Sequence, residues 1–177
     1  MSNRHIATLL AATTLAVGGA LAVVAAGEQD ASRQAVVAER GARVMPFSLE
    51  ATTHEFDATA TGGTQRVIAD DPLEGEQIRL IRGHLREEAT AFQRGDFADP
   101  AAIHGADMPG LPALPRGFQR ITVRYRDLPR GAEIVYRTKD PTLAAAIGDW
   151  FDAQLRDHGA HATPAQHSGS GHSSHPR

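Results

Sequence analysis

The sequence predicts an α+β domain over residues 44–158, in which two ββα units form one four-stranded antiparallel sheet with two helices on one face. Three observations support this fold class. Two pairs of alternating polar and apolar runs are each interrupted by a glycine-containing turn, an Asp-Pro pair follows each hairpin, and a helical apolar pattern follows each Asp-Pro pair. The two halves of the domain therefore share one order of elements.

The first unit begins with the runs TTHEFDATA and TQRVIA, which flank a turn at Gly62-Gly63. Asp71 then precedes Pro72, and an aspartate N-cap before a proline at the first helical position is a strong helix start. The pattern that follows places apolar residues three and four positions apart, as on one face of a helix. These residues are Ile78, Ile81, Leu85, Ala89 and Phe92.

The second unit repeats this order with the runs RITVRYRDL and AEIVYRT around a turn at residues 129–131. Asp140 precedes Pro141, so a helix is expected to begin at the proline. Apolar residues again recur at helical spacing, with Trp150 beside them. These residues are Leu143, Ile147, Phe151 and Leu155.

A Pro- and Gly-rich segment of residues 95–117 joins the two units and contains the stretch IHGADMPG. Connections in compact domains are usually shorter, and long ones are often functional. His104 and Met108 lie here, four positions apart, among turn-forming residues. We therefore expect this segment to close a site that neither unit completes alone.

Both ends of the chain are expected to lie outside the domain. Residues 1–26 have Arg4 and then an uncharged apolar run, which is typical of a secretory signal peptide or, if uncleaved, of a signal anchor. The polar, alanine-rich residues 27–43 are typical of a linker. The Gly/Ser/Pro-rich residues 159–177 predict a disordered, His-rich tail. The rest of the chain is then exported, to the periplasm or beyond, or held on the outer side of a membrane.

Composition excludes several classes of function. The chain has 18 basic and 21 acidic residues and a formal net charge of -3, which argues against a nucleic-acid partner. It has no cysteine, so a thiolate metal site, a cysteine nucleophile and a disulfide are all excluded. Any metal site must use histidine, methionine or carboxylate ligands.

Seven residues are candidate metal ligands because their side chains carry imidazole, carboxylate or thioether donors and are distributed over both units and the connection. They are His54, His84, Glu88, His104, Met108, His158 and His161. Each also has a structural interpretation: a core or capping histidine, a His–Glu surface pair, a cation at a helix C-terminus, or a methionine that fills the core. Their joint placement, together with a tail that carries further histidines, favours metal binding over these separate explanations.

Five stretches within about residues 44–158 carry a resemblance to known proteins, and they are TTHEF, GGTQRVIADDP, IRGHLREEATAFQRGDF, IHGADMPGL and WFDAQLRDHG. Through these stretches the chain resembles a family of small exported bacterial proteins. Such proteins share this order of motifs, often end in His-rich tails and have carried the label aspartate carbamoyltransferase. The residues do not support that activity, because the enzyme family uses a Ser-x-Arg-Thr-Arg phosphate loop and this chain has only Arg137-Thr138.

The sequence therefore indicates an exported metal-binding protein that acts as a chaperone, buffer or sensor, with copper favoured and zinc or nickel as further metals. Two alternatives remain. One is a haem protein with an axial histidine, in which the haem is non-covalent because no Cys-x-x-Cys-His motif is present. The other is a non-catalytic interaction domain whose histidines are structural. An enzyme is least favoured, because no nucleophile motif is present. The expected partner is a metal ion, with a membrane tether if the N-terminal segment is retained.

Overall fold

The computed structural model describes residues 17–165, with side chains from residue 27 onward. Its α-helices are α1 (Val17–Val44), α2 (Gly75–Phe92), α3 (Ala98–His104), α4 (Leu114–Gly117) and α5 (Pro141–His158). Its strands are β1 (Thr52–Thr59), β2 (Gly62–Ala69), β3 (Ile121–Leu128), β4 (Gly131–Thr138) and β5 (Ala162–Pro164). Short 3₁₀ turns are η1 (Leu49–Ala51), η2 (Leu111–Ala113), η3 (Phe118–Arg120) and η4 (Gly159–His161).

The general α+β class is confirmed, but the four-stranded antiparallel sheet with two helices is wrong. Within residues 17–165 the fold has five α-helices and a five-stranded mixed sheet of order β3-β4-β2-β1-β5. β1, β2, β4 and β3 pair antiparallel, whereas β5 pairs parallel to β1. The additional strand comes from the start of the segment that was expected to be disordered. It is held by backbone pairing with β1, including Ala165 N–H to Phe56 O at 2.9 Å, which needs no apolar sequence pattern.

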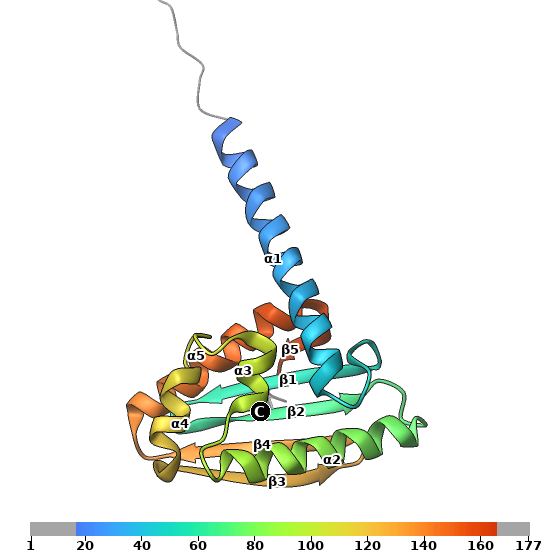
Figure 1. Cartoon of the computed structure of the whole chain (residues 1–177), viewed down its shortest axis with the longest axis vertical. Helices are drawn as coiled ribbons and strands as arrows, with labels where there is room; N and C mark the ends of the chain where they lie inside the picture. Colours follow the sequence, from blue (N-terminus) through green and yellow to red (C-terminus); the bar gives the residue numbers. More distant parts are fainter. Residues whose placement is uncertain (1–16, 166–177) are drawn as a thin grey trace, which may run out of the picture.

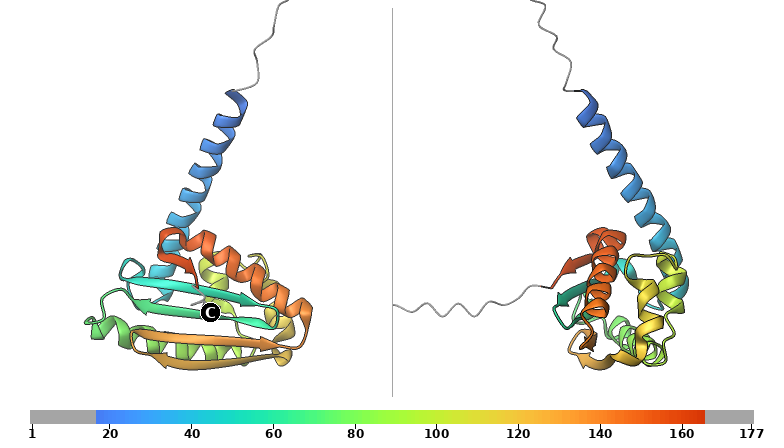
Figure 2. Two further views of the ribbon diagram at one scale, coloured as in Figure 1. Left: turned by 180° about the vertical axis from the view of Figure 1, so that it is seen from behind. Right: turned by 90° about the vertical axis from the view of Figure 1, so that its left-hand side faces the viewer.

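Within residues 17–165 the helices lie on one side of the sheet, and no helix of this part of the chain covers the other side (Figure 2). α2 packs on β4, β3 and β2, while α5 packs on β1, β2, β4 and β5. Side chains alternate along β1, so that Thr52, His54 and Phe56 are buried beneath the helices. The centre of this core is aromatic, with Trp150 in edge-on contact with Phe92 and Tyr136.

The two Asp-Pro pairs behave differently. Asp140 caps α5 as predicted, and its carboxylate accepts hydrogen bonds from the backbone N–H groups of Thr142 and Leu143. Asp71 instead accepts from the N–H of Leu73, which makes a local turn, and α2 begins later, at Gly75. The side chain of Asp71 therefore stabilises the turn before α2 and does not cap the helix.

The segment predicted to be a linker, residues 27–43, belongs to α1. This helix projects away from the domain at its N-terminal end, and its C-terminal part packs against α5 and α3 (Figure 1). Val37 is 2 % exposed in that contact. Residues 1–16 of the expected signal segment lie outside the described part of the chain. Among the helices within residues 17–165, none is long and apolar enough to cross a membrane.

The long connection between the two units is a packed layer of short helices. It contains α3, η2 and α4, and it buries Met108, Leu111 and Leu114. Gly110 allows the close approach of this layer to α5, because it has a φ of 77° and a Cβ there would lie 2.0 Å from the carbonyl oxygen of Ala146. The connection thereby holds His104, at the end of α3, over the interior of the domain.

Candidate functional site

A small polar cavity lies inside the domain, between the sheet and the helices. Its volume is about 20 Å³, enough for one or two water molecules or a single ion. Five residues that the sequence selected as candidate ligands line it, from β1, α2, α3 and α5. They are His54, His84, Glu88, His104 and His158. None of these five side chains is more than 9 % exposed.

Three of the histidine rings are linked by the contacts of His158 with His54 and with His104. His54 and His158 stack, with ring centroids 4.6 Å apart and an interplanar angle of 13°. His104 meets His158 edge-on at 5.0 Å between centroids. His84 and His54 both contact Phe47, whose ring centroid is 5.7 Å from that of His84 and 6.0 Å from that of His54. Strands and helices far apart in the sequence therefore bring these imidazoles to one place.

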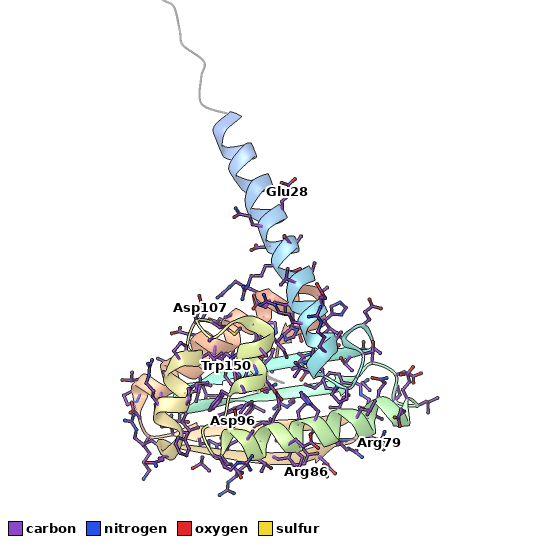
Figure 3. The ribbon with its side chains drawn as sticks, viewed as in Figure 1. Glu28, Arg79, Arg86, Asp96, Asp107 and Trp150 are labelled. Carbon is purple, nitrogen blue, oxygen red and sulfur yellow. The ribbon has the colours of Figure 1, made fainter. Side chains whose placement is uncertain are left out.

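Several buried polar atoms around this cavity have no hydrogen-bond partner in the described part of the protein. They are Nδ1 of His54, Nδ1 of His158, Nε1 of Trp150 and Nε2 of Gln154. All four residues line the cavity, and Figure 3 shows Trp150 inside the domain. A buried polar group without a partner costs about 1–3 kcal/mol. Four such groups around one cavity mark a place where a bound group would supply the missing interactions.

The stacked histidines are uncharged at neutral pH. Burial lowers the pKa of His54 to about 3. The charges of the neighbouring His104, His84 and His161 act in the same direction, and a backbone hydrogen bond with His161 opposes them. Burial likewise places the pKa of His158 well below its usual value, with further lowering by His54 and His104. Each of these rings keeps a lone pair on one nitrogen, which is the form that binds a metal ion.

Glu88 is also uncharged at neutral pH, since burial and then the negative charge of Asp99 raise its pKa to about 8. Its Oε1 lies 3.6 Å from Nε2 of His84. Burial lowers the pKa of His84 as well, although Asp99 and Glu87 oppose this shift. The pair is therefore a neutral carboxyl beside a neutral imidazole, and it is buried, unlike the surface pair considered from the sequence.

His104 is the histidine with an ionic partner. Its Nδ1 donates to Oδ2 of Asp157 at 2.9 Å. Arg33, from α1, binds both carboxylate oxygens of Asp157, with Nη2 at 2.7 Å from Oδ2, and also donates to the backbone oxygen of His104 at 3.0 Å. Burial acts to raise the pKa of Asp157, but the hydrogen bonds from His104 and Arg33 outweigh it and lower this pKa. Because Nδ1 donates, Nε2 of His104 is the nitrogen left for a ligand.

Two of the seven sequence-predicted residues do not line the cavity. Met108 is buried in the core at 2 % exposure. This is the position expected of a methionine that fills the core. His161 lies in η4 and is partly exposed. Sequence reasoning missed Met45, Gln65 and Gln154 in the lining and the Asp157–Arg33 pair behind it. Arg33 was missed because its segment was taken for a linker, and Asp157 because no sequence pattern distinguishes it from the exposed acids of α5.

The side chains in this conformation do not form a finished metal site. Within residues 17–165 no group of three or more histidine, cysteine or acidic residues is arranged to hold a metal ion. The stacking of His54 and His158 gives one reason. A metal ion binds an imidazole nitrogen in the plane of the ring, and two nearly parallel rings direct their lone pairs along separate planes. Joint binding would require one of these rings to rotate.

The cavity therefore combines uncharged imidazoles, unpaired ring nitrogens and one histidine that a carboxylate orients. This combination provides electron-pair donors and no formal charge from the two stacked histidines or Glu88. None of the residues that line the cavity is a serine, threonine, cysteine or lysine. No family model, curated protein or solved structure matches the chain.

Proposed function

We propose that this chain is an exported metal-binding protein whose buried cavity takes one transition-metal ion. The observation that carries the proposal concerns Nδ1 of His54 and Nδ1 of His158. Neither atom has a protein partner within residues 17–165, and both residues line a cavity that His84 and His104 also line. Stable burial of such groups needs a partner. A metal ion is a partner that several neutral imidazoles bind in common, and binding by both stacked histidines would require one of the two rings to rotate.

Copper is the favoured metal, and the role is that of a chaperone, buffer or sensor. Imidazole ligands suit copper, zinc and nickel, and the affinity order for divalent first-row ions places copper above the other two. The carboxylate of Asp157 behind His104 supports a metal-ligand role for that histidine, because ligating histidines commonly donate their second nitrogen to a carboxylate.

The alternatives receive less support from the same cavity. A haem needs a pocket of the size that drug-sized ligands occupy, about 300–1,000 Å³. The cavity here is about 20 Å³, so a haem would require the core to open. An interaction domain with structural histidines predicts protein partners for both ring nitrogens, but within residues 17–165 no protein group pairs with Nδ1 of His54 or of His158.

The test is metal titration of the full chain with its tail histidines removed, as the His167→Ser, His172→Ser and His175→Ser variant. We expect about one equivalent of Cu²⁺ to bind by calorimetry, and the added substitution His104→Ala to weaken binding by at least tenfold. His161→Ala is the matched control, because His161 lies outside the cavity lining. Absence of copper binding in the tail-substituted protein would overturn the proposal, as would equal losses in His104→Ala and His161→Ala.

A further inference from the structure

Met45 places a sulfur-containing side chain at the histidine cavity. It follows the last residue of α1 directly, and its backbone N–H donates to the carbonyl oxygen of Gly41 at 2.7 Å. Met45 is one of the residues that line the cavity, together with His54, His84, His104 and His158. Gly41 lies so close that a Cβ there would be 2.5 Å from Cε of Met45. The side chain is thus confined between α1 and the cavity.

The chain contains three methionines and no cysteine, so methionine supplies all of its sulfur. Met108 is the other methionine within residues 17–165, and it is packed in the core away from the cavity. The two side chains have similar burial, 8 % and 2 % exposed for Met45 and Met108. Burial alone therefore does not distinguish them, whereas contact with the histidine cavity does.

A thioether changes which ion the cavity favours. It is a soft, uncharged donor that selects monovalent copper, whereas zinc and divalent copper are well served by imidazole alone. The cost of moving an ion from water into a low-dielectric interior rises with the square of its charge. A cavity of about 20 Å³ inside the core, lined by thioether and imidazole donors, thus favours a monovalent ion on both grounds.

We propose that Met45 is a metal ligand and that the cavity binds copper as Cu(I), with Met45 and two or more of the lining histidines in the coordination shell. The inference rests on the proposed metal-binding function and specifies the ion and a ligand that the sequence did not identify. It also makes α1 part of the site, because this helix places Met45 at the cavity and Arg33 behind His104.

The experiment compares Met45→Leu with Met108→Leu in the tail-substituted full chain. Leucine conserves the volume of methionine to a close approximation, so both variants are expected to fold, and circular dichroism checks this. Cu(I) affinity is measured without oxygen by competition with a chromophoric Cu(I) chelator, and Zn²⁺ affinity by competition with a zinc indicator. We expect Met45→Leu to weaken Cu(I) binding by about tenfold or more with a much smaller effect on Zn²⁺. Met108→Leu should change neither affinity.

X-ray absorption of the copper-loaded proteins gives an independent reading. We expect a sulfur neighbour of copper in the parent and in Met108→Leu, and its loss in Met45→Leu. Equal weakening of Cu(I) and Zn²⁺ in Met45→Leu, or a copper spectrum without sulfur in the parent, would overturn the assignment of Met45 while leaving metal binding in place. Failure of the parent to bind any of these ions would instead overturn the proposed function, and this inference with it.

Discussion

His104 is held by a chain of charge-assisted hydrogen bonds that begins on the N-terminal helix. Arg33 binds Asp157, and Asp157 accepts from Nδ1 of His104. Asp157 is 4 % exposed, while Arg33 is about half-exposed at 49 %. The carboxylate therefore fixes both the orientation of the imidazole and the position of its proton, so that Nε2 is the atom available to a ligand.

Asp157→Asn is expected to lower metal affinity about 10- to 100-fold, because outer partners of metal-ligating histidines typically contribute that much. The measurement is the same competition titration in the tail-substituted chain. Asp152→Asn is the matched control, since Asp152 lies on the same helix and is exposed. Unchanged affinity in Asp157→Asn would show that His104 does not bind the ion through Nε2.

Residue patterns predicted part of the candidate site because inward-facing positions recur at fixed periods. His54 shares the inner face of β1 with Phe56, and His84 and Glu88 are one turn apart on the inner side of α2. The same reasoning does not separate Met45 from Met108. Both are apolar residues outside regular periodic patterns, and which of them reaches the cavity depends on how α1 packs against α3 and α5. That is a long-range property of the fold.

At the scale of elements, local signals predicted the elements that are stabilised locally. The cap at Asp140 and the glycine turns between β1 and β2 and between β3 and β4 need only neighbouring residues. β5 and α1 have no such signals. β5 is short and pairs with a strand about a hundred residues away, and α1 presents only a few buried residues, such as Val37, to α5 and α3. Their composition alone therefore suggested a tail and a linker.

The layer of α3, η2 and α4 depends on close backbone contact with α5, and Gly110 tests this contact. Gly110→Ala is expected to destabilise the protein by several kcal/mol, because the residue has a positive φ and the new Cβ would lie 2.0 Å from the backbone oxygen of Ala146. Gly83→Ala in α2 is the matched control, and it is expected to change the free energy of unfolding in the opposite direction. Nothing lies within 4 Å of a Cβ at Gly83, so alanine should stabilise the helix by about 0.5–1 kcal/mol. Urea unfolding of both variants measures these effects, and similar stabilities would contradict the packing described here.

For the whole molecule, the buried titratable groups of the cavity make stability depend on pH in two opposite ways. Between pH 4.5 and 6.5 the unfolded chain binds protons on His54 and His158 that the folded protein does not, and His84 acts in the same direction. The folded protein holds one proton on Glu88, whose pKa is raised from 4.5 to about 8, that the unfolded chain has lost. The net difference favours folding as pH rises toward 6.5, where the two contributions nearly cancel, and above this pH the Glu88 contribution dominates, with the reverse sign.

The metal-free protein is therefore expected to be most stable near pH 6.5. Below that value the unfolding constant should increase several-fold over the first unit of acidification and more steeply after it, because the net uptake on unfolding approaches one proton as both histidines become protonated in the unfolded chain. Between pH 6.5 and 8 it should increase about fourfold in total, because Glu88 loses its proton on unfolding and the folded carboxyl itself becomes half ionised at about pH 8. Urea unfolding from pH 5 to 9 in the presence of a chelator measures the dependence of stability on pH on both sides of the maximum.

Glu88→Gln should remove the loss of stability above pH 6.5 and keep the loss below it, since an amide stays neutral at every pH. If the loss of stability above pH 6.5 is unchanged in Glu88→Gln, Glu88 is ionised in the folded protein. If stability does not fall below pH 6.5, the stacked histidines are protonated in the folded protein.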